Sequence, residues 1–206
     1  MAISEPDVRA AGFCLLLANR RPVTVEELAT VLDGDVETVA RLLTNLDGRG
    51  SVRRDVQGRL VGSAGLSVVP WRHEMRVGDR RFWTWCAYDA LGILGALEAD
   101  GTVISSSPAT GARIEIPFRA GRPLRHDLAL FRVQMWDCAS VEEEYCPLVN
   151  LFETADGAVA WAEEEGRAGE VLTIDEATDK GAAEWRPLLI ERTGHQLLAQ
   201  TDDDCC

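Results

Sequence analysis

The sequence lacks the features that define several large classes of protein. None of its six cysteines forms a C-x-x-C pair, so the ligand spacing of a structural zinc site is missing. The histidines are scattered at His73, His126 and His195, without helical spacing to a carboxylate or to one another. We interpret each as an ordinary surface or packing residue. No apolar run approaches the roughly 20 residues of a membrane span.

Basic residues are also scarce. The chain has 21 Lys and Arg against 34 Asp and Glu, and its formal net charge is −13. Such a chain repels nucleic acid and anionic membranes unless its basic residues are concentrated in one place. Glu5 and Asp7 stand where a secretion signal has basic residues, and the apolar run from Ala10 to Ala18 is short. We therefore expect a cytoplasmic protein with reduced thiols and no nucleic-acid or membrane partner.

Residues 1–65 predict a winged-helix-like N-terminal module. A first helix is expected at 6–19, and a capping box of Thr24 and Glu27 predicts the start of a second helix. The apolar stripe of 36–46 predicts a third helix, and a hairpin turning near residues 55–58 follows it. Three helices followed by a hairpin are typical of a winged helix.

The module does not have the charge pattern of a DNA reader. Its third helix, which would read the bases, has only Arg41 as a basic residue. The one arginine cluster lies near the hairpin, at Arg49, Arg53, Arg54 and Arg59. We therefore favour a packing or lid function for this module over DNA binding.

Residues 66–200 predict an α+β core, and residues 201–206 an acidic tail that ends in Cys205 and Cys206. A buried helix is expected at 82–98, and a mostly helical segment with an interruption at Pro187 is expected at 176–198. Strands are expected in LSVVPWRHEMRVGDRRFW, TVISSS, RIEIPF, LALFRVQMWDC, YCPLVNLF and GEVLTI, and a short helix in DGAVAWAEEEG. Since helices and strands do not alternate regularly, we expect a mixed or antiparallel sheet flanked by helices.

The segment WTWCAYDA places a thiol and a carboxyl group, Cys86 and Asp89, three residues apart in apolar surroundings. On a helix this spacing puts both groups on one face. Desolvation would raise the pKa of Asp89 and let it carry a proton near neutral pH. The alternative is a small buried cysteine beside an aspartate held by a backbone amide or by Arg80 or Arg81. The residues alone favour this second interpretation.

A second isolated cysteine, Cys146, begins the expected strand YCPLVNLF. Pro147 removes one backbone donor from that strand, which indicates an edge or a bend that could aim the thiol into a cavity. A buried structural cysteine is the default interpretation.

These segments resemble the alkylmercury lyase, or organomercurial lyase, family. RRFWTWCAYDALGILGAL is similar to its signature helix, VISSSPATGARIEI to its strand–turn–strand, and YCPLVNLF to its second-cysteine segment. AVAWAEEEGRAGEVLTIDEA is similar to its C-terminal tryptophan helix and the following strand. The resemblance covers nearly the whole chain, weakly at 1–65 and strongly at 81–111 and 145–175.

The resemblance implies a function in mercury detoxification. The family cleaves carbon–mercury bonds by protonolysis and releases a hydrocarbon and Hg(II), without an added cofactor. Its two catalytic cysteines fall on Cys86 and Cys146 and its catalytic aspartate on Asp89, and these three would also hold the mercury. Thiolates are preferred ligands of this soft metal. The implied partners are organomercurial substrates and small-molecule thiols, with mercuric reductase as a candidate acceptor of Hg(II).

The sequence departs from the family pattern at four positions. A family cysteine in the strand–turn–strand is Ser107 here, and the cysteine that often follows the catalytic one is Pro147. Two nearby histidines of the family are Leu148 and Asn150. A second hypothesis is a noncatalytic protein that binds or senses mercury or another soft metal through its thiols. That hypothesis would make the N-terminal module a regulator's DNA-binding unit, but it has no use for Asp89.

Overall fold

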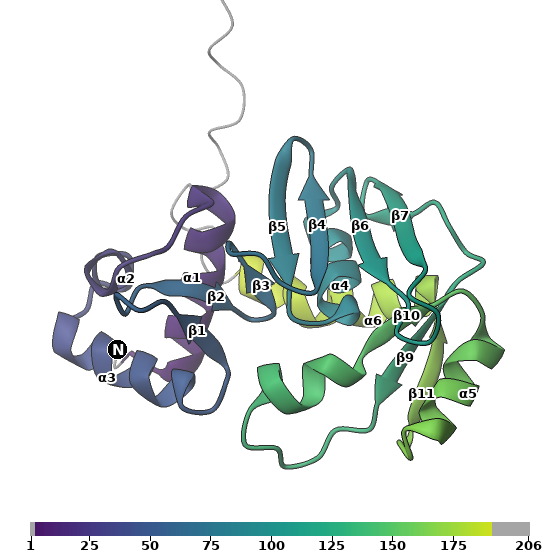
Figure 1. Cartoon of the computed structure of the whole chain (residues 1–206). Coiled ribbons are helices and arrows are strands. Elements are labelled where there is room, and N and C mark those ends of the chain that lie inside the picture. Colours follow the sequence, from purple (N-terminus) through teal and green to yellow (C-terminus); the bar gives the residue numbers. More distant parts are fainter. Residues whose placement is uncertain (1–2, 191–206) are drawn as a thin grey trace, which may run out of the picture.

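The computed structural model describes residues 3–190 as a helical N-terminal part joined to two sheets with helices packed on them (Figure 1). The helices are α1 (Glu5–Asn19), α2 (Val25–Leu32), α3 (Val36–Asp47), α4 (Ala87–Leu97), α5 (Ala155–Glu164) and α6 (Ile174–Ile190). Two short helical turns, η1 (Val141–Tyr145) and η2 (Cys146–Leu148), lie between α4 and α5 in the chain. This arrangement confirms the predicted α+β class.

The larger sheet has eight strands in the order β1-β2-β3-β5-β4-β6-β7-β8, and every pair is antiparallel. The strands are β1 (Val52–Arg54), β2 (Leu60–Ser63), β3 (Leu66–Ser67), β4 (His73–Val77), β5 (Arg80–Thr84), β6 (Gly101–Ser106), β7 (Arg113–Arg119) and β8 (Arg122–Pro123). A second antiparallel sheet has the order β10-β9-β11, from β9 (Ala129–Val133), β10 (Asn150–Phe152) and β11 (Gly169–Thr173).

The N-terminal part contains three helices and the β1–β2 hairpin. The Thr24 hydroxyl accepts a hydrogen bond from Glu27 N and the Glu27 carboxylate accepts one from Thr24 N, so the predicted capping box is present. The large sheet continues from β2 into β3 across residue 65. The winged-helix assignment and the division into residues 1–65, 66–200 and 201–206 stay predictions.

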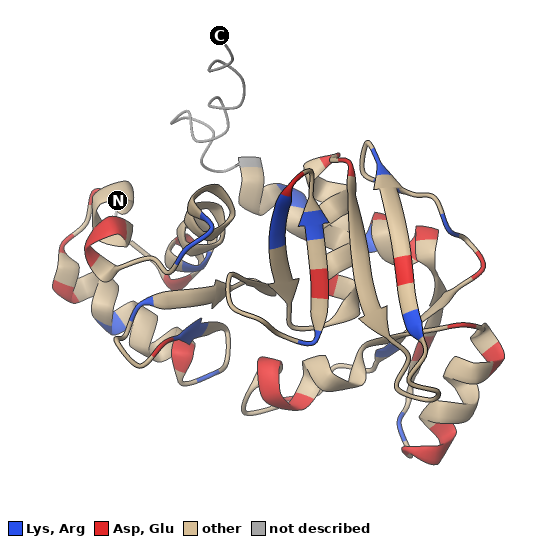
Figure 2. Ribbon diagram, turned by 45° about the horizontal axis from the view of Figure 1, so that its top comes forward, with Lys and Arg blue, Asp and Glu red and all other residues tan. Residues whose placement is uncertain are grey.

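Acidic and basic residues lie together on α1–α3 and on the hairpin (Figure 2). Several of the arginines near the hairpin pair with carboxylates: Arg54 with Asp47, Arg59 with Asp55, and Arg53 with Glu142. These pairs leave the hairpin cluster with little unpaired positive charge. The absence of DNA binding stays a prediction.

Helix α4 is the centre of the core. All of its residues except Leu97 are buried, because it lies between the large sheet, the small sheet and α6. Helices α4 and α6 approach each other closely where Gly92 faces Gly181. A Cβ built at Gly181 would lie only 2.6 Å from the Gly92 Cα, so a side chain there would force the two helices apart. Helix α4 also packs against β4, β5 and β6. The first turn of α4 is thereby fixed from several sides.

Four predicted elements differ from the structure. The helix expected at 82–98 begins at Ala87, because residues 80–84 pair with β4 as strand β5. The strand expected at 128–138 ends at Val133, and the one expected at 145–152 is confined to residues 150–152. Helix α6 continues through Pro187 rather than breaking there, and its described part ends at Ile190.

No helix among residues 3–190 is long and apolar enough to cross a membrane. His195, Cys205 and Cys206 lie outside the described residues. His73 is buried and its Nδ1 lies 2.8 Å from the Ser105 hydroxyl, whereas the exposed His126 lies 2.8 Å from an Asp175 carboxylate oxygen. Both fit the predicted packing and surface functions.

Candidate active site

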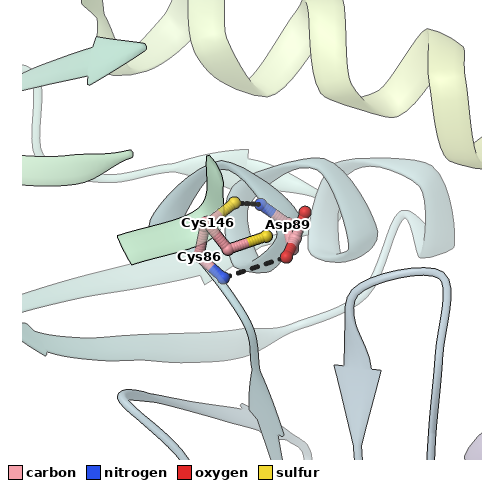
Figure 3. Close-up of side chains that lie close together, drawn as sticks. All are labelled: Cys86, Asp89 and Cys146. Carbon is pink, nitrogen blue, oxygen red and sulfur yellow. Dashed lines mark hydrogen bonds between the residues drawn. The ribbon is translucent and has the colours of Figure 1, made fainter. Parts of the chain in front are cut away.

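The three residues singled out by the sequence lie together. The sulfur atoms of Cys86 and Cys146 and a carboxylate oxygen of Asp89 all lie within 4.8 Å of one another (Figure 3). All three residues are buried, with exposed fractions of 2%, 2% and 7%. Two soft sulfur ligands and one carboxyl group therefore converge, although sixty residues separate the two cysteines in the chain.

Cys86 is the N-cap of α4, not a residue within it. The Cys86 sulfur accepts a hydrogen bond from Asp89 N at 3.4 Å, and the Asp89 carboxylate accepts one from Cys86 N at 2.9 Å. This is a capping box with cysteine in the position that serine or threonine usually occupies. The prediction that both side chains share a helix face is thus wrong, but the same spacing of three brings them together. Thr84 fixes the entry to the helix by donating to the Cys86 carbonyl.

Cys146 reaches the cluster on a turn and not on a strand. It ends the η1 turn and begins the η2 turn, so the bend expected at Pro147 is present while the strand there is not. The Val149 carbonyl accepts a hydrogen bond from Ala87 N at 3.2 Å, and Val149 N donates to the Cys146 carbonyl at 3.1 Å. These two bonds connect the turn that carries Cys146 to Ala87, the first residue of α4. Cys86 caps the same helix.

Asp89 is confined by a glycine on its other side. Gly65 has φ +83°, and a Cβ built on it would lie 2.5 Å from the Asp89 Cγ. The Gly65 carbonyl accepts a hydrogen bond from Trp85 N. Neither of the arginines considered as a partner of Asp89, Arg80 or Arg81, forms an ion pair with it among the described residues, and Arg81 pairs with Glu74. The backbone amide that holds this carboxylate is that of Cys86.

Burial dominates the ionisation of Asp89. Desolvation raises the pKa of its carboxyl group from the ordinary 3.8 to about 6, although the hydrogen bonds from Cys86 and the positive charge of Arg9 act in the opposite direction. At neutral pH the carboxyl group is therefore mainly ionised, with a pKa close enough for it to take up and give back a proton.

The two thiols are not equivalent. Burial raises the pKa of Cys86 well above its ordinary value, and a hydrogen bond with Cys146 raises it further. The same hydrogen bond acts to lower the pKa of Cys146, although burial and the nearby Asp89 charge leave that pKa raised as well. The pKa of Cys86 is thus raised further than that of Cys146, so Cys146 is the sulfur that loses its proton more readily.

The cluster lines a cavity of about 770 Å³. This size suits a small organic ligand. Its walls come from α1, the β2–β3 turn, the start of α4, β9 with the segment after it, the start of β11, and α6. Its apolar and aromatic lining residues include Trp85, Tyr88, Met135, Tyr145 and Trp185. The two thiols therefore line a space large enough for a ligand as well as a metal ion.

Charged residues on one side of the cavity form a connected network. The Arg132 guanidinium lies 4.7 Å from the Tyr88 ring centroid and forms ion pairs with Glu170 and Glu184. The Tyr88 hydroxyl donates to Glu184 at 2.8 Å. Lys180 completes the network through its ion pair with Glu170.

Sequence reasoning missed several residues that shape this site. Tyr145 lines the cavity directly before Cys146 in the chain, and that adjacency could have identified it. Arg9, Gly65 and Glu184 come from distant segments without a motif, so no signal in one sequence points to them.

Cys14, Cys138 and the positions that depart from the family pattern differ in their distance from the cluster. The Cys14 thiol donates to the Leu188 carbonyl, and the partly buried Cys138 precedes η1. Ser107 is buried after the end of β6 and does not line the cavity. The Asn150 amide donates to the Pro147 carbonyl and so supports the turn that carries Cys146.

Comparisons with known proteins agree on one family. The family model described as alkylmercury lyase (MerB) matches residues 66–185. An alkylmercury lyase of Streptomyces lividans is 31% identical over 194 residues, which cover 93% of this chain and 84% of that protein. One of Bacillus cereus is 28% identical over 169 residues, which cover 81% of this chain and 75% of that protein. The crystal structure of the mercury-bound form of MerB2 superposes with a TM-score of 0.77 at 25% identity, over 85% of this chain and 86% of that one.

Proposed function

As this chain belongs to the alkylmercury lyase family and is therefore a carbon–mercury lyase, we propose that it breaks this bond by protonolysis. Cys86 and Cys146 bind the mercury, and Asp89 carries the proton. The observation that supports this most strongly is the convergence of two thiols and one carboxyl group with a raised pKa on a single cavity.

Capture begins at Cys146. Its sulfur attacks the mercury of an R–Hg–X substrate and displaces X⁻, and the thiol proton leaves with X⁻ or passes to solvent. The product of this step is Cys146–S–Hg–R. A soft, polarisable sulfur is a far better ligand for mercury than an oxygen would be.

The second thiol then binds as its proton moves to Asp89. The Asp89 carboxylate already lies beside Cys86, because it accepts a hydrogen bond from the Cys86 backbone N–H. The proton of the Cys86 thiol therefore has a short path to this carboxylate. Mercury now has two sulfur ligands and R. The added electron density makes the carbon bonded to mercury more carbanion-like, and therefore a stronger base.

Protonation of that carbon completes the reaction. The neutral Asp89 carboxyl group delivers its proton to carbon, the Hg–C electron pair forms the new C–H bond, and R–H leaves. Asp89 returns to its carboxylate form and Hg(II) stays bound by the two thiolates. No redox change occurs, so this sequence of steps requires no added cofactor.

Release of Hg(II) requires competing ligands, because two thiolates hold this metal tightly. Small-molecule thiols in excess would remove it, and the dithiol of a mercuric reductase is a candidate final acceptor. Direct transfer would be detected as mercury on the reductase after mixing with the loaded lyase in the absence of small thiols.

The direct test is gas chromatography of the hydrocarbon released from an organomercurial in the presence of excess free thiol. The proposal predicts one hydrocarbon for each Hg(II) formed. Stoichiometric mercury binding without any hydrocarbon would favour the thiol-based sensor instead.

A gel-shift assay tests the prediction that residues 1–65 do not bind DNA. A salt-sensitive, sequence-selective shift in the nanomolar range would contradict it.

A further inference from the structure

One cation of the active-site cavity has no assigned function. Arg9, on α1, lines the same cavity as Cys86, Asp89 and Cys146. Its backbone is held in place because the Ser63 hydroxyl donates to the Arg9 carbonyl at 2.8 Å, which joins α1 to β2. Residues 8, 10 and 11 around it are buried, so the helix cannot rotate to remove this side chain from the rim.

Arg9 differs from the other arginine of the cavity in its partners. Arg132 is already neutralised by Glu170 and Glu184. Within residues 3–190, the Arg9 guanidinium forms no ion pair or hydrogen bond, although Asp89 and Glu184 are near enough to interact with its charge. Arg9 is an exposed residue of the rim, and partial desolvation there lowers its pKa, but a guanidinium remains charged at every physiological pH.

An unpaired guanidinium at the rim of a reactive cavity is suited to a planar anion. Its fork of N–H donors matches the two oxygens of a carboxylate. In a chain with a net charge of −13, such a site also offsets the general repulsion of anionic ligands. Arg9 lowers the pKa of Asp89 and so affects the proton transfer of every substrate alike, but the capture and proton-transfer steps themselves take place at sulfur and carboxyl oxygen.

We propose that Arg9 binds a carboxylate on a ligand that enters this cavity. The carboxylate belongs either to the organic group of the mercurial or to the small thiol that removes Hg(II). Both ligands must lie beside the two cysteines, and Arg9 lines the space that they would share. The inference rests on the proposed function, because both ligands are defined by that reaction.

Two matched pairs of compounds separate the two sources. The substrate pair is 4-mercuribenzoate and phenylmercury, which differ by one carboxylate, with neutral 2-mercaptoethanol as the thiol. The thiol pair is mercaptoacetate and 2-mercaptoethanol at subsaturating concentration, with phenylmercury as the substrate. For each pair, the measurement is the ratio of kcat/KM for the charged member to that for the neutral member.

Arg9→Gln should lower one of these ratios about tenfold, the usual worth of a charge-assisted hydrogen bond at a partly exposed site. Arg9→Lys should retain part of the ratio, since it keeps the charge but loses the fork. Arg41→Gln, which removes an exposed arginine on α3, is the control and should change neither ratio. A fall in the substrate ratio shows that Arg9 binds a carboxylate on the organic group of the mercurial. A fall in the thiol ratio shows that it binds a carboxylate on the small thiol.

Unchanged ratios in Arg9→Gln would overturn the inference, even if all four rates fell together. A second measurement needs no variant: high salt should reduce the affected ratio of the native enzyme, and a ratio that is insensitive to salt contradicts the proposal. Failure of the proposed function looks different, because the native enzyme would then release neither benzene nor benzoate from the substrate pair.

Discussion

Replacing Asp89 by asparagine should make the protein more stable and the enzyme far slower. Asparagine keeps an oxygen that can accept the hydrogen bond from Cys86 N, so the capping box of α4 is preserved. What it removes is the ionisable group. The variant therefore isolates the effect of the proton from the effect of the fold.

The stability change follows from the shifted pKa. The folded protein holds the Asp89 proton more tightly than the unfolded chain does, since the pKa rises from 3.8 to about 6. The stability from this group is thus fully present below about pH 4 and is lost as the pH rises through about 6. The loss amounts to about 3 kcal/mol above pH 7, at about 1.4 kcal/mol for each pKa unit. The asparagine variant would escape this loss because an amide stays neutral.

Urea unfolding at pH 4 and pH 8 measures this difference. We expect Asp89→Asn and the native protein to have similar free energies of unfolding at pH 4, and the variant to be more stable by about 3 kcal/mol at pH 8. Asp79→Asn, at an exposed turn, is the control and should show no such pH-dependent gain. A variant that is less stable than the native protein at pH 8 would refute the assignment of Asp89 as a desolvated acid.

The kinetic half of the prediction uses the same variant. Both thiols remain, so Hg(II) binding should persist, whereas hydrocarbon release should slow by on the order of 10²–10⁴-fold. In the native enzyme, kcat/KM should decrease below about pH 6, because the carboxylate must be ionised to accept the thiol proton. A near-native rate in Asp89→Asn would show that the aspartate is structural, whatever the family.

Three substitutions and one deletion further test the site. Changing Cys86 or Cys146 to serine should abolish hydrocarbon release, as measured by gas chromatography, because a hydroxyl is a poor ligand for mercury. Gly65→Ala should displace the Asp89 carboxyl group and reduce kcat more than mercury binding, since its Cβ would lie 2.5 Å from the Asp89 Cγ; unchanged kcat would mean that this contact relaxes freely. Deleting Cys205 and Cys206 should leave turnover in excess small-molecule thiol nearly unchanged, and a large loss would place the tail in the active site.

Local sequence rules predicted the N-terminal helices well and the start of α4 poorly. Thr24 and Glu27 form the capping box that their spacing indicates, and α2 begins after Thr24. The same box at Cys86 and Asp89 was missed because cysteine is not a usual N-cap residue. The apolar pattern therefore extends the expected helix back to residue 82, although residues 82–84 pair with β4 in the large sheet. Long-range strand pairing decides that boundary, and one sequence does not reveal it.

The site depended even more on distant contacts. The residues alone favoured a structural interpretation of Cys86 and Asp89, and only the family resemblance joined Cys146 to them. The physical link between the segments is a backbone hydrogen bond from Ala87 N to the Val149 carbonyl, which any residue types could form. For the same reason Arg9 left no signal, since its function follows from where α1 packs.

The two interpretations of Asp89 are complementary. The carboxylate is held by a backbone amide, as a structural residue would be, and that bond is what places it beside the Cys86 thiol. The box also directs Asp89 N toward the Cys86 sulfur, so the partial positive charge of the α4 N-terminus favours the thiolate that mercury needs. Burial raises the pKa of both the Cys86 thiol and the Asp89 carboxyl group. A proton can therefore be taken up or given back by either group. Under the proposed mechanism, a helix cap therefore supplies the mercury ligand, the acid and their separation within a single turn of backbone.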